Sequence, residues 1–156
     1  MLGETVYPLL FFGDTVHQQD TKIEEMEELG QHEALEYFYL LRTFVAFFFH
    51  DVEIMEACMA KLTKPAEGVW IQWVKFFECF LLIQGLPDCK GKKRKELKDE
   101  IEARKGRLVD WYNQGNPNPN SMISILDAEY LIVKEGGHGL SAMKVQGVWD
   151  VAIEAA

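Results

Sequence analysis

The sequence has few cysteines and no pair of them at metal-binding spacing. Cys58, Cys79 and Cys89 are odd in number, and none belongs to a C-x-x-C motif. These features argue against a disulfide framework and against a structural zinc site. The four histidines are far apart, and none has a second ligand at helical spacing. We therefore expect a chain from a reducing compartment that holds no metal and no other cofactor.

Positive charge is scarce in the first third of the chain. Before residue 60 the only basic residues are Lys22 and Arg42, whereas glutamates are frequent, and the 156 residues carry a formal net charge of −9. A protein that wraps phosphate backbones needs a basic surface, so we expect no nucleic-acid partner. The acidic residues are more typical of a solvated surface than of a cation site.

No apolar stretch is both long and free of charge. The two longest, residues 35–49 and 69–86, contain four charged residues: Glu36, Arg42, Lys75 and Glu78. Ionised groups at those depths are costly in lipid, which favours buried helices over membrane spans. The first residues also lack the positive leader of a secretory signal. We expect a cytoplasmic protein with no membrane partner.

Apolar residues at helical spacing dominate what is present, and no segment alternates with a period of two. Hydrophobic residues make up 48% of the chain, which is ample for the core of one domain. Turn and capping residues divide the sequence into three pairs of expected helices: 33–49 with 51–62, 67–84 with 92–113, and 119–135 with 140–156. The sequence therefore predicts an all-α fold.

The two members of a pair differ in their apolar pattern. Segments 33–49 and 67–84 are apolar on nearly all sides, which predicts that both helices are packed between neighbours. Segment 92–113 is mostly charged and has a single apolar stripe, formed by Leu97, Ile101, Leu108 and either Trp111 or Tyr112. Alternating inner and outer helices are typical of stacked helix pairs. We therefore predict an α-solenoid of about three antiparallel pairs.

Four stretches carry a family resemblance: NQGNPNPN at 113–120, ILDAEYL at 125–131, WDVAIEAA at 149–156, and MAKLTKPAEGVW at 59–70. They resemble the tetratricopeptide-like helical region of very large multidomain signalling ATPases. There, the region links an ATPase module to sensor kinase or nucleotide cyclase modules. The resemblance implies that residues 31–156 form a tetratricopeptide-like domain inside a larger repeat array. Residues 1–30 would then be the remnant of a preceding helical unit plus an acidic linker.

One basic cluster stands out near the start of the predicted helix 92–113. It consists of Lys90, Lys92, Lys93, Arg94, Lys95 and Lys98. Positive charge at a helix start opposes the helix macrodipole, so this cluster is a candidate docking site for an acidic protein partner. The sequence nevertheless favours a solvated helix start, because four acidic residues follow at once: Glu96, Asp99, Glu100 and Glu102.

The last predicted helix reaches the end of the sequence in the middle of an apolar stripe. Trp149 and Ile153 lie on that stripe, and no Gly, Asn or Pro follows to close the helix. We expect a neighbouring repeat unit, or more chain, to cover it, and self-association through this helix when neither is present. Trp149 and Ile153 are therefore further candidate partner-binding residues.

No catalytic constellation is apparent. Between Gly85 and Gly91 lie five residues where a phosphate-binding loop has four, and Lys93 stands where that loop needs Ser or Thr. We therefore predict a non-enzymatic module that acts by protein contact, as a docking surface or spacer in a signalling protein. The alternative is an all-α domain that binds a small apolar ligand among its aromatic residues, or that has an unrecognised enzymatic activity.

We expect the chain to bind neither ATP nor GTP, because the loop at residues 85–93 lacks both the spacing and the metal-binding hydroxyl of a phosphate-binding loop. Calorimetric titration with each nucleotide, with and without magnesium, should give no saturable heat. Saturable binding at micromolar nucleotide that is lost on Lys92→Ala would contradict this prediction.

Overall fold

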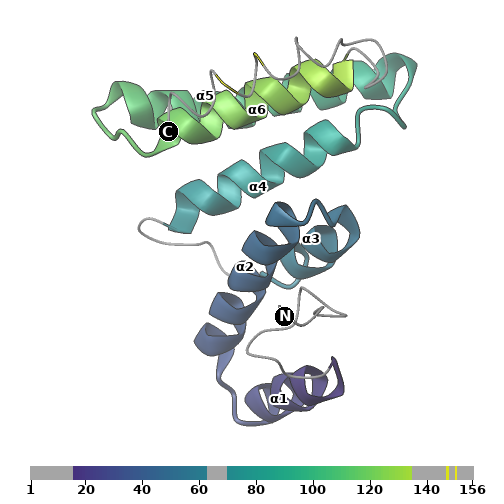
Figure 1. Ribbon diagram of the computed structural model, residues 1–156, viewed down its shortest axis with the longest axis vertical. Coiled ribbons are helices and arrows are strands. Elements are labelled where there is room, and N and C mark those ends of the chain that lie inside the picture. The colour runs from purple at the N-terminus through teal and green to yellow at the C-terminus, as the bar shows by residue number, and fades with distance from the viewer. Residues whose placement is uncertain (1–15, 63–69, 135–146, 148–149, 151–156) are drawn as a thin grey trace, which may run out of the picture. The chain divides into compact units, whose positions relative to one another are not determined.

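The computed structural model describes residues 16–62, 70–134, 147 and 150 (Figure 1). Within these residues the chain forms six α-helices and no strand, which confirms the predicted all-α class. The helices belong to two compact units, residues 1–65 and 66–156. Each unit is described by itself.

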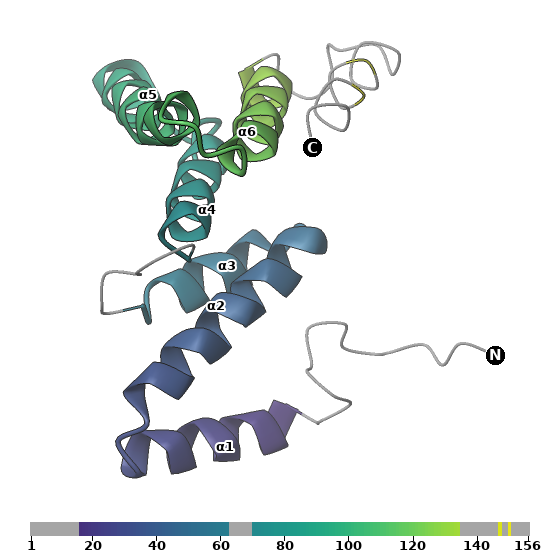
Figure 2. The same cartoon turned by 90° about the vertical axis from the view of Figure 1, so that its left-hand side faces the viewer.

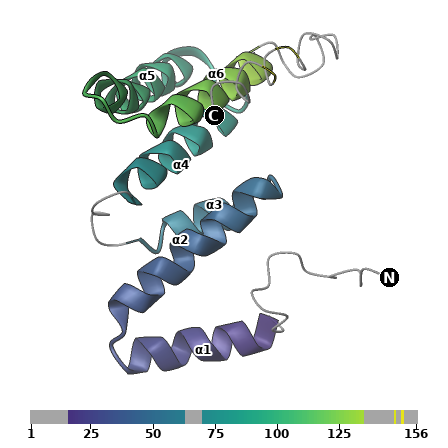
Figure 3. The same ribbon diagram turned by 60° about the vertical axis from the view of Figure 1, so that its left-hand side comes forward.

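The first unit contains α1 (Val16–Glu28), α2 (His32–Phe48) and α3 (Val52–Met59). Helix α1 meets α2 at a sharp corner, and α3 runs back along α2 (Figure 3). At the corner, Gly30 adopts a φ of 63°, which lets the backbone N–H of Gln31 donate to the carbonyl of Met26 at 2.9 Å. A left-handed residue that closes a helix in this way is usually glycine.

The start and end of α3 follow from local hydrogen bonds. The carboxylate of Asp51 accepts from the backbone N–H of Ile54 at 3.1 Å, which confirms that Asp51 caps this helix. The predicted helix 51–62 is three residues too long at its end. The N–H groups of Lys61 and Leu62 donate to carbonyls three residues back, so the chain tightens into a turn there.

The core of the first unit lies where the three helices meet. Leu35 and Tyr39 of α2 are buried against Cys58 of α3. Five partly buried side chains pack around them, two from α1, one from α2 and two from or just after α3: Ile23, Met26, Phe38, Ile54 and Leu62. The acidic helix α1 is thus held to the unit by a narrow apolar edge.

The second unit contains α4 (Trp70–Gln84), α5 (Gly91–Asn113) and α6 (Pro119–Lys134), and each helix contacts the other two (Figure 2). No residue of α4 is exposed, as expected for a helix that is apolar on nearly all sides. On α5, Ile101 and Leu108 are buried and Trp111 is half-buried, whereas Tyr112 is 44% exposed. The apolar stripe of α5 therefore ends in Trp111.

Polar contacts tie α5 and α4 to their neighbours. Arg104 of α5 pairs with Glu78 of α4, and the next residue, Lys105, pairs with Asp127 of α6 at 2.9 Å. Gln84 of α4 donates to the buried carboxylate of Glu129 on α6, also at 2.9 Å. Adjacent residues of α5 thus reach two different helices, which fixes the rotation of α5 about its axis.

Replacing Leu108 by Ala should destabilise the chain strongly, because the side chain is fully buried. Deleting a core leucine costs about 2–5 kcal/mol. Tyr112→Ala, one turn further along the same helix, should cost far less because that side chain is exposed. Urea unfolding of both variants measures the difference, and equal losses would show that the α5 stripe is placed incorrectly.

Candidate functional site

One side of α2 carries apolar residues that remain exposed. The exposed α2 stripe consists of Ala34, Tyr37, Leu41, Phe44 and Phe48. Tyr37 is 51%, Leu41 47% and Phe48 78% exposed. Ala34 is exposed as well, and Phe44 is half-buried. Steps of three and four residues place all five side chains on one face of the helix, and none of them is charged.

The opposite side of α2 forms part of the core of the first unit. Leu35, Tyr39, Thr43 and Ala46 are buried there, and the Thr43 hydroxyl donates to the Tyr39 carbonyl at 2.9 Å. The prediction that segment 33–49 is packed on all sides is therefore wrong for the described residues. Helix α2 has two apolar faces, and only one of them is buried.

The exposed α2 stripe has the properties of a protein-docking surface. At roughly 200 Å² for a full side chain, the exposed parts of Tyr37, Leu41 and Phe48 amount to roughly 350 Å². That is already within the range of the largest patch on a typical monomer, which is often functional. Aromatic residues are enriched at interfaces, and steps of three and four suit contact with another helix.

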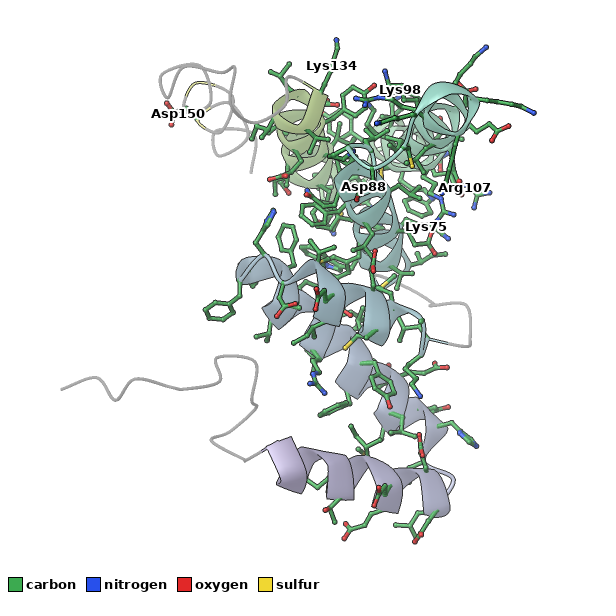
Figure 4. All side chains as sticks on the ribbon, turned by 90° about the vertical axis from the view of Figure 1, so that its right-hand side faces the viewer. Lys75, Asp88, Lys98, Arg107, Lys134 and Asp150 are labelled. Carbon is green, nitrogen blue, oxygen red and sulfur yellow. The ribbon has the colours of Figure 1, made fainter. Side chains whose placement is uncertain are left out.

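The predicted basic cluster forms the start of α5 in the second unit. Four of its members are exposed, Lys90, Lys92, Lys93 and Lys95, whereas Arg94 and Lys98 are half-buried. Figure 4 labels Lys98 together with Arg107, which lies further along α5. Lys92 approaches Glu96 at 3.5 Å, but its side chain is 91% exposed, so this pair is worth little. The cluster is an accessible positive surface, and its role in partner binding stays a prediction.

The other two predicted partner-binding residues, Trp149 and Ile153, lie outside the described residues. The same holds for the predicted helix 140–156, of which only Gly147 and Asp150 are described, both with helical backbone.

The buried cysteines lack the properties of nucleophiles. The Cys79 thiol is fully buried, lies 3.7 Å from the carbonyl oxygen of Ile101, and has its pKa raised to about 12 by burial. Burial also raises the pKa of Cys58, although the nearby charge of Arg42 opposes the shift. A reactive cysteine needs a lowered pKa and access to solvent. At neutral pH both residues are uncharged components of the core.

Other kinds of site find no support in the described part of the chain. No group of three or more His, Cys, Asp or Glu side chains there is arranged to hold a metal ion. None of the described helices combines the length and the apolar character that crossing a membrane requires.

The aromatic residues proposed to enclose an apolar ligand are packed against one another. Phe76 and Phe77 are fully buried, and the Trp73 and Phe76 rings meet edge to face at 5.9 Å between centroids. An open hollow of about 440 Å³ lies at the corner between α1 and α2, lined by residues 30–34. Because no aromatic side chain lines that hollow, it does not match the predicted ligand pocket.

Comparison of the chain with protein-family models, with curated proteins and with solved structures finds no match. The resemblance of residues 113–120 and 149–156 to a tetratricopeptide-like region therefore stays an expectation. What the chain does has to be argued from its own surfaces.

Sequence reasoning missed the exposed α2 stripe because two apolar faces overlap in one segment. A signal was nevertheless present. Ala34, Tyr37, Leu41, Phe44 and Phe48 repeat strictly in steps of three and four without a polar residue. Two complete apolar faces on one helix indicate that both are suited to packing against neighbours.

The stability of the fold should fall as the pH rises above about 9. Burial raises the pKa values of Tyr39, Cys58 and Cys79, so the unfolded chain releases these protons at lower pH than the folded chain. Burial alone would lower the pKa of Lys105, but its hydrogen bond to Asp127 raises it above the usual value, and the folded form therefore retains that proton. All four shifts favour the folded state below pH 9, and that contribution is lost as the pH rises toward 12.

Urea unfolding between pH 7.5 and 11 measures this loss. Cys79→Ala should flatten the dependence on pH. Leu108→Ala is the control, because it removes core packing and leaves the titrating groups in place. A wild-type stability that stays constant up to pH 11 would contradict the argument.

Proposed function

We propose that the chain is a non-catalytic helical-repeat module that acts by protein contact, as a docking surface or spacer between parts of a larger assembly. The exposed α2 stripe is the observation that carries the proposal. A helix face of five apolar residues, three of them aromatic, is suited to burial against another protein.

The packing of the second unit supports a repeat arrangement. Helices α4, α5 and α6 follow one another along the chain, and each contacts both of the others. Helix α4 has no exposed residue, whereas α5 is charged outside its single apolar stripe. Such an alternation of covered and one-sided helices is what a stack of helix pairs produces. We therefore retain the α-solenoid of antiparallel pairs as part of the proposal.

The cellular setting that we propose rests on the resemblance alone. Residues 113–120, 125–131 and 149–156 are similar to the tetratricopeptide-like region of multidomain signalling ATPases. On that basis the module works in signal transduction in the cytoplasm, and its partners are neighbouring repeat units or domains of such a protein. In this proposal no residue of the chain has a catalytic role.

The two candidate surfaces suit different tasks. The exposed α2 stripe can supply affinity, because apolar aromatic contacts carry most of the binding energy at protein interfaces. The basic cluster at the start of α5 suits the attraction and orientation of an acidic partner, which mainly raises the association rate. A partner that uses both would be attracted by charge and retained by apolar contact.

Photo-crosslinking tests whether the stripe contacts protein. A photoreactive phenylalanine derivative at position 41 should form specific adducts with protein in cells that express the chain, and mass spectrometry identifies them. The same group at position 112 is the matched control, because Tyr112 is exposed to a similar degree on α5. Adducts at position 112 but none at position 41 would show that the stripe is not a docking surface.

Variants of the basic cluster test its separate role. Replacing Lys92, Lys93 and Lys95 by Ser should leave the helix content nearly unchanged, since all three side chains are exposed and such substitutions change stability little. For a purified partner found by crosslinking, this variant should lower the association rate and weaken the dependence of that rate on salt, while position 41 still crosslinks. A salt-sensitive partner whose association rate is unchanged by the three substitutions would contradict the docking role of the cluster.

A further inference from the structure

We propose that Arg42 and Tyr39, which are close to one turn apart on α2, bind a carboxylate that a protein partner supplies. The inference deepens the proposed function. The source of the carboxylate rests on that function, whereas the binding chemistry does not. Three observations support the site: an arginine without a counter-ion among the described residues, the partial removal of its guanidinium from water, and a second donor beside it.

Arg42 is an unpaired positive charge in an acidic unit. Residues 1–65 contain twelve acidic and four basic residues. Even so, no carboxylate of residues 16–62 or 70–134 forms an ion pair with Arg42. The nearby carboxylate of Asp51 instead accepts from the backbone N–H of Ile54. Arg104 shows the contrast, since it pairs with two carboxylates of its own unit. Arg42 can therefore pair with a carboxylate from another molecule.

The guanidinium of Arg42 is partly removed from water. Its Nε is fully enclosed and has no hydrogen-bond partner within the described part of the chain, whereas the residue as a whole is half-buried and its outer nitrogens reach the surface. Removing a charged group from water costs free energy unless a hydrogen bond or a counter-charge replaces the lost hydration. An anion at the outer edge is attracted more strongly to this guanidinium than to a fully hydrated one, because the local dielectric constant is lower.

Tyr39 supplies a second donor. It lies three residues before Arg42, and side chains at that spacing are neighbours on a helix. Only 9% of Tyr39 is exposed, yet its hydroxyl has no hydrogen-bond partner among the residues that the structure describes. A buried tyrosine hydroxyl usually has such a partner. Burial raises the pKa values of Tyr39 and Cys58, and the charge of Arg42 opposes both shifts, which is consistent with a guanidinium close to both residues.

The two donors suit a carboxylate better than a phosphate. The outer nitrogens of an arginine can donate to both oxygens of a carboxylate at once, and a tyrosine hydroxyl can donate to one of them. A phosphate group carries close to two charges at neutral pH, so the acidic residues of the unit repel it about twice as strongly. Glu27 is close enough that its charge adds to the rise in the pKa of Tyr39 that burial causes. A singly charged, planar oxyanion therefore fits best.

An aspartate or glutamate of a protein partner is the source that fits the proposed function. Arg42 lies at the edge of the buried face of α2, seven residues after Leu35, and next to Leu41 of the exposed α2 stripe. Arginine is enriched among the residues that carry binding energy at interfaces. A partner without a carboxylate at this position would leave Arg42 uncompensated, so the site selects partners that carry one.

Titration with sodium acetate tests the binding chemistry. In nitrogen–proton correlation spectra of the full chain, the Nε–H signal of Arg42 is assigned by its loss in Arg42→Lys. Acetate at constant ionic strength should shift this signal saturably, with a dissociation constant on the order of 10 mM, as expected for an anion of four heavy atoms. Tyr39→Phe should weaken binding roughly tenfold. Exposed Arg107 is the control in the same spectra, and its signal should not saturate.

Urea unfolding separates a binding role of Arg42 from a structural one. Arg42→Met should leave the unfolding midpoint unchanged or raise it, because the change removes an uncompensated charge and no internal ion pair. Arg104→Met is the matched control and should lower the midpoint, because Arg104 pairs with both Glu78 and Glu100. A midpoint that Arg42→Met lowers as much as Arg104→Met does would show that Arg42 stabilises the fold through an internal partner, and would overturn the inference.

Photo-crosslinking identifies the source of the carboxylate. With the photoreactive group at position 41, Arg42→Met should lower the yield of protein adduct at least tenfold, because the carboxylate of the partner loses its counter-charge. Adducts that persist at full yield while acetate binds would overturn the protein source and point to a free small carboxylate.

The inference and the proposed function can fail separately. No saturable shift with acetate, or tighter binding of inorganic phosphate than of acetate, would overturn the carboxylate site, even if position 41 forms adducts with protein. If acetate binds and position 41 forms no adduct while position 112 does, the proposed function and the protein source fail, whereas the carboxylate site of Arg42 and Tyr39 stands.

Discussion

The structure depends on how each helix that is apolar on nearly all sides is covered. Helix α4 meets this requirement, since it contacts α5 and α6 and leaves no residue exposed. Helix α2 does not, because its core face is buried with α1 and α3 while Tyr37, Leu41 and Phe48 remain exposed. An exposed apolar surface of that kind often marks an interaction site. The proposals about function follow from this difference between two helices of similar composition.

The fold class and most helix bounds were predictable because their signals are local. Asp51 caps α3 as predicted, and α5 buries Ile101 and Leu108 as its single apolar stripe requires. The inward side of α2 was not predictable, because its two faces are equally apolar. Thr43 even suggests the opposite orientation, because a polar residue usually lies on the solvent side of a helix. In the structure Thr43 is fully buried, and its hydroxyl donates to a backbone carbonyl.

The two candidate sites also differ in whether the sequence reveals them. A run such as Lys92 to Lys95 can be located from sequence, because charged side chains stay at the surface wherever the helix packs. Whether an aromatic residue such as Phe48 is core or interface depends on how many neighbours the fold supplies, and that is a property of tertiary structure. Composition alone therefore identifies charged surfaces and overlooks apolar ones.

The two proposed surfaces should differ in their response to salt. Every copy carries a formal net charge of −9, so two copies repel one another at long range. Added salt screens charges of this kind and leaves apolar contact at the exposed α2 stripe intact. Capture of an acidic partner by the cluster around Lys92 depends on attraction between charges, which the same salt weakens. Under the proposed function, added salt should therefore weaken contact through the cluster and spare contact through the exposed α2 stripe.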